Sequence, residues 1–76
     1  MILSQAQAEA VYSAMCALNN VGNVCGKVAV SASHAKNDIE IRWDADGVKI
    51  VRGMLVCNAR ELYSTQAAFA AAYNLQ

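Results

Sequence analysis

The charged side chains of this chain are concentrated in its middle. Apart from Glu9 and Lys27, every Asp, Glu, Lys and Arg lies within residues 36–61. The flanking segments, roughly 3–21 and 62–76, are rich in alanine and nearly uncharged, although their apolar residues recur at helical spacing. A helix on the surface of a lone soluble protein normally keeps a charged face toward water. We therefore expect these two helices to pack against each other, a second copy of the chain or a partner.

Length and charge limit the classes of protein that this chain can represent. Its 76 residues, 57% of them hydrophobic, predict one small domain over residues 1–76 whose core is marginal without outside support. The formal net charge is zero, so no overall positive field attracts nucleic acid or a membrane surface. The longest apolar run, 67–73, is far below the roughly 20 residues of a membrane helix. The N-terminal residues do not resemble a secretion signal, so we expect a soluble, cytoplasmic protein.

A first helix is predicted over about residues 4–20. The hydroxyl of Ser4 can accept a hydrogen bond from the amide of Gln7 while the Gln7 side chain reaches back, which is the pattern of a capping box. Gly22 is expected to end the helix, because glycine enters the left-handed conformation without strain. One stripe of this helix is expected to face the core: Ala8, Val11, Ala14, Met15 and Leu18.

Alternating residues predict an antiparallel sheet in the middle of the chain. Residues 27–33 alternate as in a half-buried strand, and the polar segment 34–38 is expected to connect it to the next strand. The strongest local pattern is a β-hairpin in which 39–43 and 48–50 flank the sequence Asp-Ala-Asp-Gly.

The positions of the apolar residues in the two strands of the hairpin determine how the strands pair. The apolar residues have odd numbers in the first strand and even numbers in the second, so they share a face only if opposed residue numbers add to an odd sum. A two-residue loop at 46–47 satisfies this condition and pairs Trp43 with Ile50 and Asp44 with Lys49. A three-residue loop would place Trp43 opposite Lys49 and is disfavoured. The residues then predicted on the polar face are Glu40, Arg42, Asp44 and Lys49, with Asp46 at the tip.

Residues 58–63 allow two interpretations. Asn58 with Glu61 could form a capping box that begins the second helix early. Alternatively, residues 60–63 form a fourth strand before a helix capped by Ser64 or Thr65, which we favour because the cap pair directly follows the strand.

The second helix is predicted over about residues 65–74, with Phe69, Ala72 and Tyr73 on its core stripe and Ala70 elsewhere. The complete pattern predicts a two-layer α+β fold: helix 1 at about 4–20, an antiparallel meander of three or four strands at about 26–63, and helix 2 at about 65–74. Both helices are expected on one face of the sheet.

The sequence contains few groups that could carry catalysis. Its three cysteines, Cys16, Cys25 and Cys57, are an odd number at irregular spacing, so we expect free thiols buried as small apolar side chains. His34 is the sole histidine, and it lacks the short spacings of a zinc site. Asp44 and Asp46 are ordinary turn residues. We therefore expect no enzymatic activity, catalytic residue, cofactor or metal.

These exclusions leave a binding module. We predict that it contacts another protein through the polar hairpin face, with partner-binding residues Glu40, Arg42, Asp44, Asp46 and Lys49. No motif identifies a family. In size and chemistry alone, the chain resembles small accessory proteins of phages and mobile elements, such as anti-CRISPR proteins, which inhibit a host or defence complex by occupying a site on it.

Two alternatives come from other classes. A structural homodimer could assemble through the alanine-rich helices. A weak binder of single-stranded nucleic acid could use a patch of basic residues beside Trp43, namely Arg42, Lys49, Arg52 and Arg60. Nucleic acid is the less favoured partner, because acidic residues interleave with the basic ones on the same strands.

Overall fold

The computed structural model describes residues 1–30, 38–53 and 59–75. The chain forms a helix, a four-stranded antiparallel sheet and a short second helix, which confirms the predicted two-layer α+β fold. The elements are α1 (Gln5–Asn20), β1 (Gly26–Val30), β2 (Ile39–Asp44), β3 (Gly47–Arg52), β4 (Ala59–Tyr63) and α2 (Gln66–Ala72).

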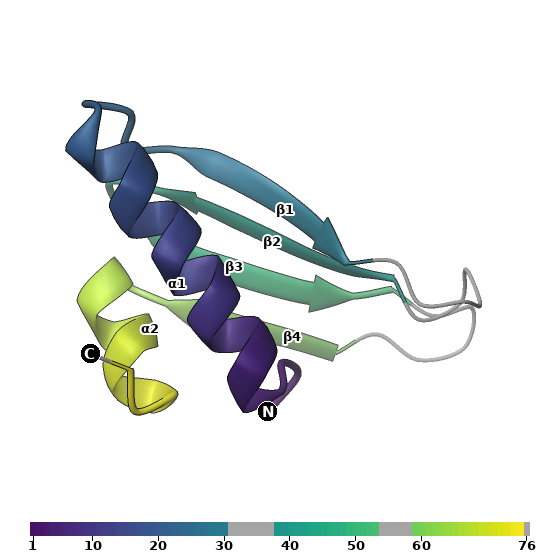
Figure 1. Cartoon of the computed structure of the whole chain (residues 1–76). Helices are drawn as coiled ribbons and strands as arrows, with labels where there is room; N and C mark the ends of the chain where they lie inside the picture. The colour runs from purple at the N-terminus through teal and green to yellow at the C-terminus, as the bar shows by residue number, and fades with distance from the viewer. Residues whose placement is uncertain (31–37, 54–58, 76) are drawn as a thin grey trace.

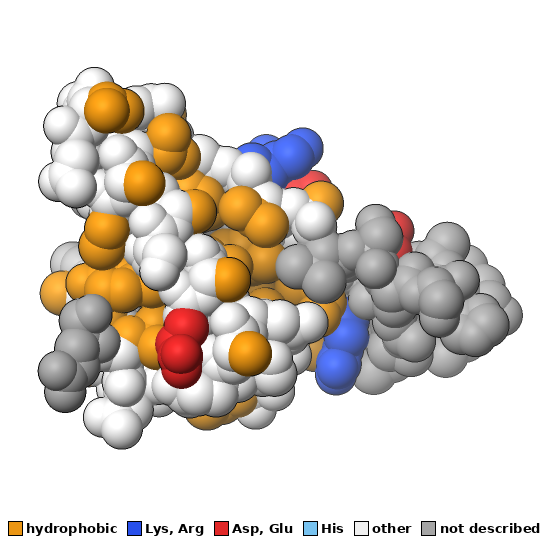
Figure 2. Space-filling view, in the orientation of Figure 1, with side chains coloured by type: hydrophobic (Ala, Val, Ile, Leu, Met, Phe, Trp, Pro, Cys, Tyr) orange, Lys and Arg blue, Asp and Glu red, His pale blue; other side chains and the backbone are white. Residues whose placement is uncertain are grey.

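The strands follow the chain order across the sheet, from β1 to β4, and each pairs with its neighbour in antiparallel fashion. Both helices lie on the same face of this sheet, with α1 crossing the strands and α2 beside β4 (Figure 1). We call the other face of the sheet the open face. The helix layer carries few charged side chains (Figure 2), since Glu9 is the one charged residue within α1 and α2.

The predicted caps define the limits of α1. Ser4 Oγ accepts a hydrogen bond from the Gln7 N–H at 3.1 Å, and Gln7 Oε1 accepts one from the Ser4 N–H at 2.9 Å. At the other end, Gly22 has a φ of 83°, and the Asn23 N–H donates to the carbonyl oxygen of Leu18 at 2.9 Å. This is a Schellman motif, which satisfies carbonyl groups that the helix itself leaves free.

The hairpin has the predicted two-residue loop, but one residue earlier than expected. Ala45 and Asp46 form the loop, so Trp43 pairs with Val48 instead of Ile50. Neither loop residue has a positive φ, and Asp44 Oδ1 accepts a hydrogen bond from the Asp46 N–H at 2.7 Å, which stabilises a turn of this kind. The prediction was wrong because it assumed the mirror-image turn, in which glycine occupies the loop itself.

Gly47 has a different role from the one predicted for it. It is the first residue of β3 and has a φ of 148°, a conformation that other residues rarely adopt. A Cβ atom at this position would collide with the carbonyl oxygen of Tyr63. The one-residue shift of the loop keeps opposed numbers at an odd sum, so the predicted division of side chains between the two faces holds.

The sequence allows either an early helix or a fourth strand before the second helix, and the structure contains the strand. Residues 59–63 form β4, so the early helix is excluded, and Thr65 Oγ1 caps α2 by accepting a hydrogen bond from the Ala68 N–H at 2.9 Å. Ala70 is buried and Ala72 is exposed, the reverse of their predicted positions. The predicted part of the first strand at 31–33 and the turn at 34–37 lie outside the described residues.

The core lies between the helices and the sheet. Its fully buried large side chains are Met15 from α1, Ile41 and Ile50 from the central strands, and Phe69 from α2. Leu18 and Ala14 of the predicted α1 stripe are only partly buried. No described helix is both long and apolar enough to cross a membrane.

Candidate functional site

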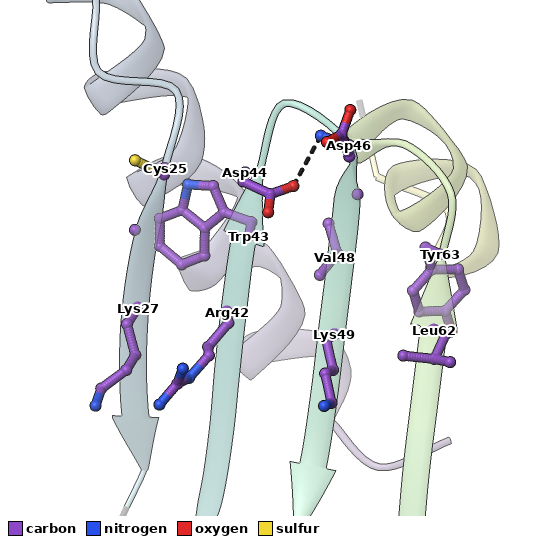
Figure 3. Close-up of a pocket in the computed structure, with 12 residues that line it drawn as sticks. Cys25, Lys27, Arg42, Trp43, Asp44, Asp46, Val48, Lys49, Leu62 and Tyr63 are labelled. Atoms are coloured by element: carbon purple, nitrogen blue, oxygen red, sulfur yellow. Dashed lines mark hydrogen bonds between the residues drawn. The ribbon is translucent and has the colours of Figure 1, made fainter.

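One row of side chains crosses all four strands on the open face. The register places Lys27 of β1 opposite Arg42 of β2, Arg42 opposite Lys49 of β3, and Lys49 opposite Leu62 of β4. The close-up shows the four side chains side by side (Figure 3). We call these four residues the basic row, because three cations are followed by one apolar side chain.

The basic row is exposed to solvent. The side chains of Lys27 and Arg42 are 55% and 62% exposed, and Leu62 is 65% exposed, which is unusual for a large apolar residue in the middle of a strand. Arg60 lies on the same face in the neighbouring row, because it pairs with Val51, the residue after buried Ile50. The open face therefore has more positive than negative charge.

Glu40 is the nearest counter-charge to the row. Its carboxylate lies 2.5 Å from Nε of Arg42 and 3.9 Å from Nζ of Lys27, so one carboxylate serves two cations. Lys49 has no ion pair with any residue in the described part of the chain. Such exposed pairs contribute about 0–1 kcal/mol each, so they do not prevent a partner from binding these cations.

The two aspartates of the hairpin are at one end of this surface. Asp44 is the last residue of β2 and Asp46 is in the loop, while Lys27, Arg42 and Lys49 extend in the opposite direction along the strands (Figure 3). Together they line an open groove of about 700 Å³ at the hairpin end of the sheet. Since the Asp44 side chain is hydrogen-bonded within the turn, its first role is to shape the loop.

The five residues predicted to bind a partner all lie on the hairpin of β2 and β3. Glu40, Arg42, Asp44 and Lys49 share the open face, and Asp46 is in the loop. The prediction omitted Lys27 and Leu62. The alternation of residues 27–33 already placed Lys27 on a polar face, but the face of Leu62 depended on a strand whose existence was itself uncertain.

The basic patch predicted for nucleic acid does not assemble as one surface. Arg52 pairs with Ile39 and Ala59, which places it on the helix side of the sheet, whereas Arg42, Lys49 and Arg60 are on the open face. Trp43 is only 4% exposed and belongs to the core. It therefore offers no exposed ring on which a base could stack.

Trp43 nevertheless forms part of the groove wall. The edge of its ring lies against Gly26, the residue opposite it in β1, and a Cβ atom at Gly26 would be 2.7 Å from Cε2 of the ring. The indole Nε1 is buried and has no hydrogen-bond partner among the described residues. The ring therefore closes the hairpin end of the core without a polar contact to its side chain from any described residue.

A second polar cluster lies on the helix side. Glu61 of β4 accepts hydrogen bonds from the hydroxyl groups of Tyr73 at 2.5 Å and Tyr63 at 3.4 Å, and from the Ile2 N–H at 3.1 Å. Burial, together with the Glu61 carboxylate, raises the pKa of both tyrosines above their ordinary value. Both hydroxyls stay protonated at neutral pH, so this cluster joins the N-terminus, β4 and α2 as a set of structural contacts.

The thiols differ from their prediction in one respect. Cys16 and Cys25 are free, as expected, but both are exposed instead of buried. Cys57 and His34 lie outside the described residues. Within those residues, no group of three or more His, Cys, Asp or Glu side chains could hold a metal ion.

The fold and this face define a two-layer α+β domain with a basic row on the sheet face opposite the two helices. No protein-family model, curated protein sequence or solved structure matches the chain.

Proposed function

We propose that the chain is a non-enzymatic protein-binding module whose open face contacts another protein. The observation that carries this proposal is the basic row, in which Lys27, Arg42 and Lys49 are exposed beside an exposed Leu62. Charged side chains around an apolar one are typical of surfaces that select a partner by charge and anchor it by burial. The proposed action is steric: a module without a reaction of its own occupies a site on its partner.

The setting we propose is that of a phage or mobile-element inhibitor. In this proposal, the partner is a subunit of a bacterial defence or nuclease complex, and binding blocks the site through which that complex engages its target. The small size of the domain and its compact charged face support this role.

Affinity capture with matched variants tests the proposal. The tagged chain is incubated with bacterial lysate, and retained proteins are identified by mass spectrometry. The variant R42Q/K49Q lowers the net charge by two at the centre of the open face. The control variant A10E/A17E lowers it by the same amount at exposed positions of α1. We expect a partner that the original chain and the control retain and that R42Q/K49Q loses.

A parallel check of folding shows whether R42Q/K49Q loses the partner through its changed surface or through unfolding. R42Q/K49Q changes two exposed side chains, so its thermal midpoint should stay close to that of the original chain. A partner that R42Q/K49Q retains as well as the control would show that the open face is not the binding surface. The stronger variant R42E/K49E should then also retain it.

A homodimer is the second candidate, and one observation favours it. Alanine occupies three of the nine exposed positions of α1 and all three exposed positions of α2, and its small side chain lets another backbone approach closely. These positions are Ala6, Ala10 and Ala17 in α1 and Ala67, Ala71 and Ala72 in α2. Sedimentation velocity over a concentration series separates the candidates, because a dimer predicts a mass that rises with concentration. In that case A10E/A17E, and not R42Q/K49Q, should abolish the association.

A further inference from the structure

We propose that the basic row binds an extended acidic segment of another protein that crosses the strands and ends on an apolar side chain. This inference rests on the proposed function and specifies the chemistry of the partner. It follows from the order of the row, in which Lys27, Arg42 and Lys49 precede Leu62. A segment of matching order has carboxylates first and an apolar residue last.

The spacing of the strands gives the spacing of the segment. Neighbouring strands are about 4.8 Å apart, so the three gaps between β1 and β4 span about 14 Å. Alternate side chains of an extended peptide are about 6.7 Å apart and point the same way. Three of them therefore cover the row: a carboxylate at Lys27, a second between Arg42 and Lys49, and an apolar side chain at Leu62. The predicted pattern is acid-x-acid-x-apolar.

The existing contacts favour an outside carboxylate at this place. Glu40 serves both Lys27 and Arg42, and at 3.9 Å its contact with Lys27 is long. Lys49 has no counter-ion within the residues that the structure describes. A carboxylate between Arg42 and Lys49 would thus add an ion pair that the described residues do not supply.

The same face is a poor match for nucleic acid. The rings of Trp43, Tyr63 and Tyr73 all lie in or against the core, so the described part of the open face has no ring for a base to stack on. Leu62 fits an apolar side chain of a protein better than a sugar-phosphate backbone.

Synthetic peptides with a fixed spacing provide the test. The full chain, labelled with ¹⁵N, is titrated with the peptide Ser-Glu-Ser-Glu-Ser-Leu-Ser and followed by two-dimensional NMR. Three comparison probes are the same peptide with Leu replaced by Ser, the same peptide with both Glu replaced by Gln, and a short oligothymidylate. We expect the first peptide to shift the amide signals of the basic row and to leave those of α1 unchanged.

A double-mutant cycle shows whether Leu62 receives the leucine. Replacing the peptide's leucine with serine should weaken binding about fivefold, the scale expected for partial burial of such a side chain. The protein variant L62S should weaken binding of the leucine peptide by a similar factor and leave the affinity for the serine peptide unchanged. R42Q should lower the affinity for both peptides roughly threefold, which is the effect expected from the loss of one exposed ion pair.

The results that overturn the inference are distinct from those that overturn the proposed function. Absent shifts, shifts confined to α1, or stronger binding of oligothymidylate at physiological salt would each exclude an acidic protein segment as the ligand. If R42Q/K49Q still loses its captured partner, the open face remains a binding surface and only the proposed ligand is wrong. If R42Q/K49Q retains the captured partner as well as the original chain does, the proposed function itself fails.

Discussion

The hydroxyl of Tyr73 donates a hydrogen bond to Oε1 of Glu61 at 2.5 Å, and this contact joins the last helix to the last strand. The same hydroxyl accepts a hydrogen bond from the Leu3 N–H at 3.3 Å. Tyr73 is only 2% exposed, so few water molecules can replace these partners. The Tyr73 side chain therefore links the N-terminus, β4 and the C-terminal end of α2.

Removing the Tyr73 hydroxyl should destabilise the domain. Y73F keeps the ring, but it leaves the Leu3 N–H without its partner and Glu61 Oε1 with only the longer hydrogen bond from Tyr63, which costs about 1–3 kcal/mol. The control is Y12F, because the Tyr12 hydroxyl has no hydrogen bond to any described residue, and its cost should stay within about 0.5 kcal/mol. Urea denaturation measures both. Equal stabilities of the two variants would contradict the bridging role.

The tyrosines also predict a loss of stability in alkali. Burial raises the pKa of Tyr73 and of Tyr63 in the folded state, while in the unfolded chain each has a pKa of about 10. Their contribution to the free energy of unfolding is therefore complete below pH of about 10. It is lost as the pH rises from there toward the folded pKa, because the unfolded chain then releases the protons first.

Comparison with Y73F isolates this effect from the titration of lysines. The difference in unfolding free energy between the original chain and Y73F should be constant at neutral pH and should shrink above pH of about 10. A difference that stays constant up to the highest usable pH would show that Tyr73 keeps its ordinary pKa.

Replacing individual glycines with alanine should lower the stability of the domain by different amounts. G47A combines a positive φ with a collision against the Tyr63 carbonyl oxygen, so it should cost more than about 2 kcal/mol. G22A meets no atom within 4 Å but keeps the strained φ of 83°, so it should cost about 1 kcal/mol. G53A has no positive φ and meets no atom of the described residues within 4 Å, so it should be neutral or slightly stabilising. Thermal unfolding gives the order, and a G53A as damaging as G47A would refute it.

Trp43 reports on the packing at Gly26. The chain has one tryptophan, so its fluorescence comes from this ring alone. G26A should displace the ring, which lies too close for a Cβ atom, and shift the emission to longer wavelength as water reaches the indole. A29S, an exposed change in the same strand, is the control and should leave the emission unchanged.

The exposed thiols can be counted in the folded protein. In a C57S background, Cys16 and Cys25 should both react with a disulfide reagent at the rate of an accessible thiol, without denaturant. The variants C16S and C25S should each react with one fewer equivalent of the reagent per protein molecule. A thiol that reacts only in denaturant would contradict its exposure.

Local rules sufficed where the interaction is local. The Ser4–Gln7 capping box, the Gly22 stop and the Thr65 cap all depend on residues within a few positions of one another, so their pattern is visible in the sequence. The faces of the hairpin were also predictable, because alternation survives a one-residue error in the loop.

The sequence by itself therefore determined the order of the elements, the division of β2 and β3 into core and open faces, and the scarcity of charge on the helices. Only the tertiary structure decided the rest. It brought Lys27 and Leu62 into one row with Arg42 and Lys49, and it turned Glu61 toward Tyr73. The reason is physical: these contacts join segments far apart in the chain, and pairing across strands depends on register and packing that no local pattern records.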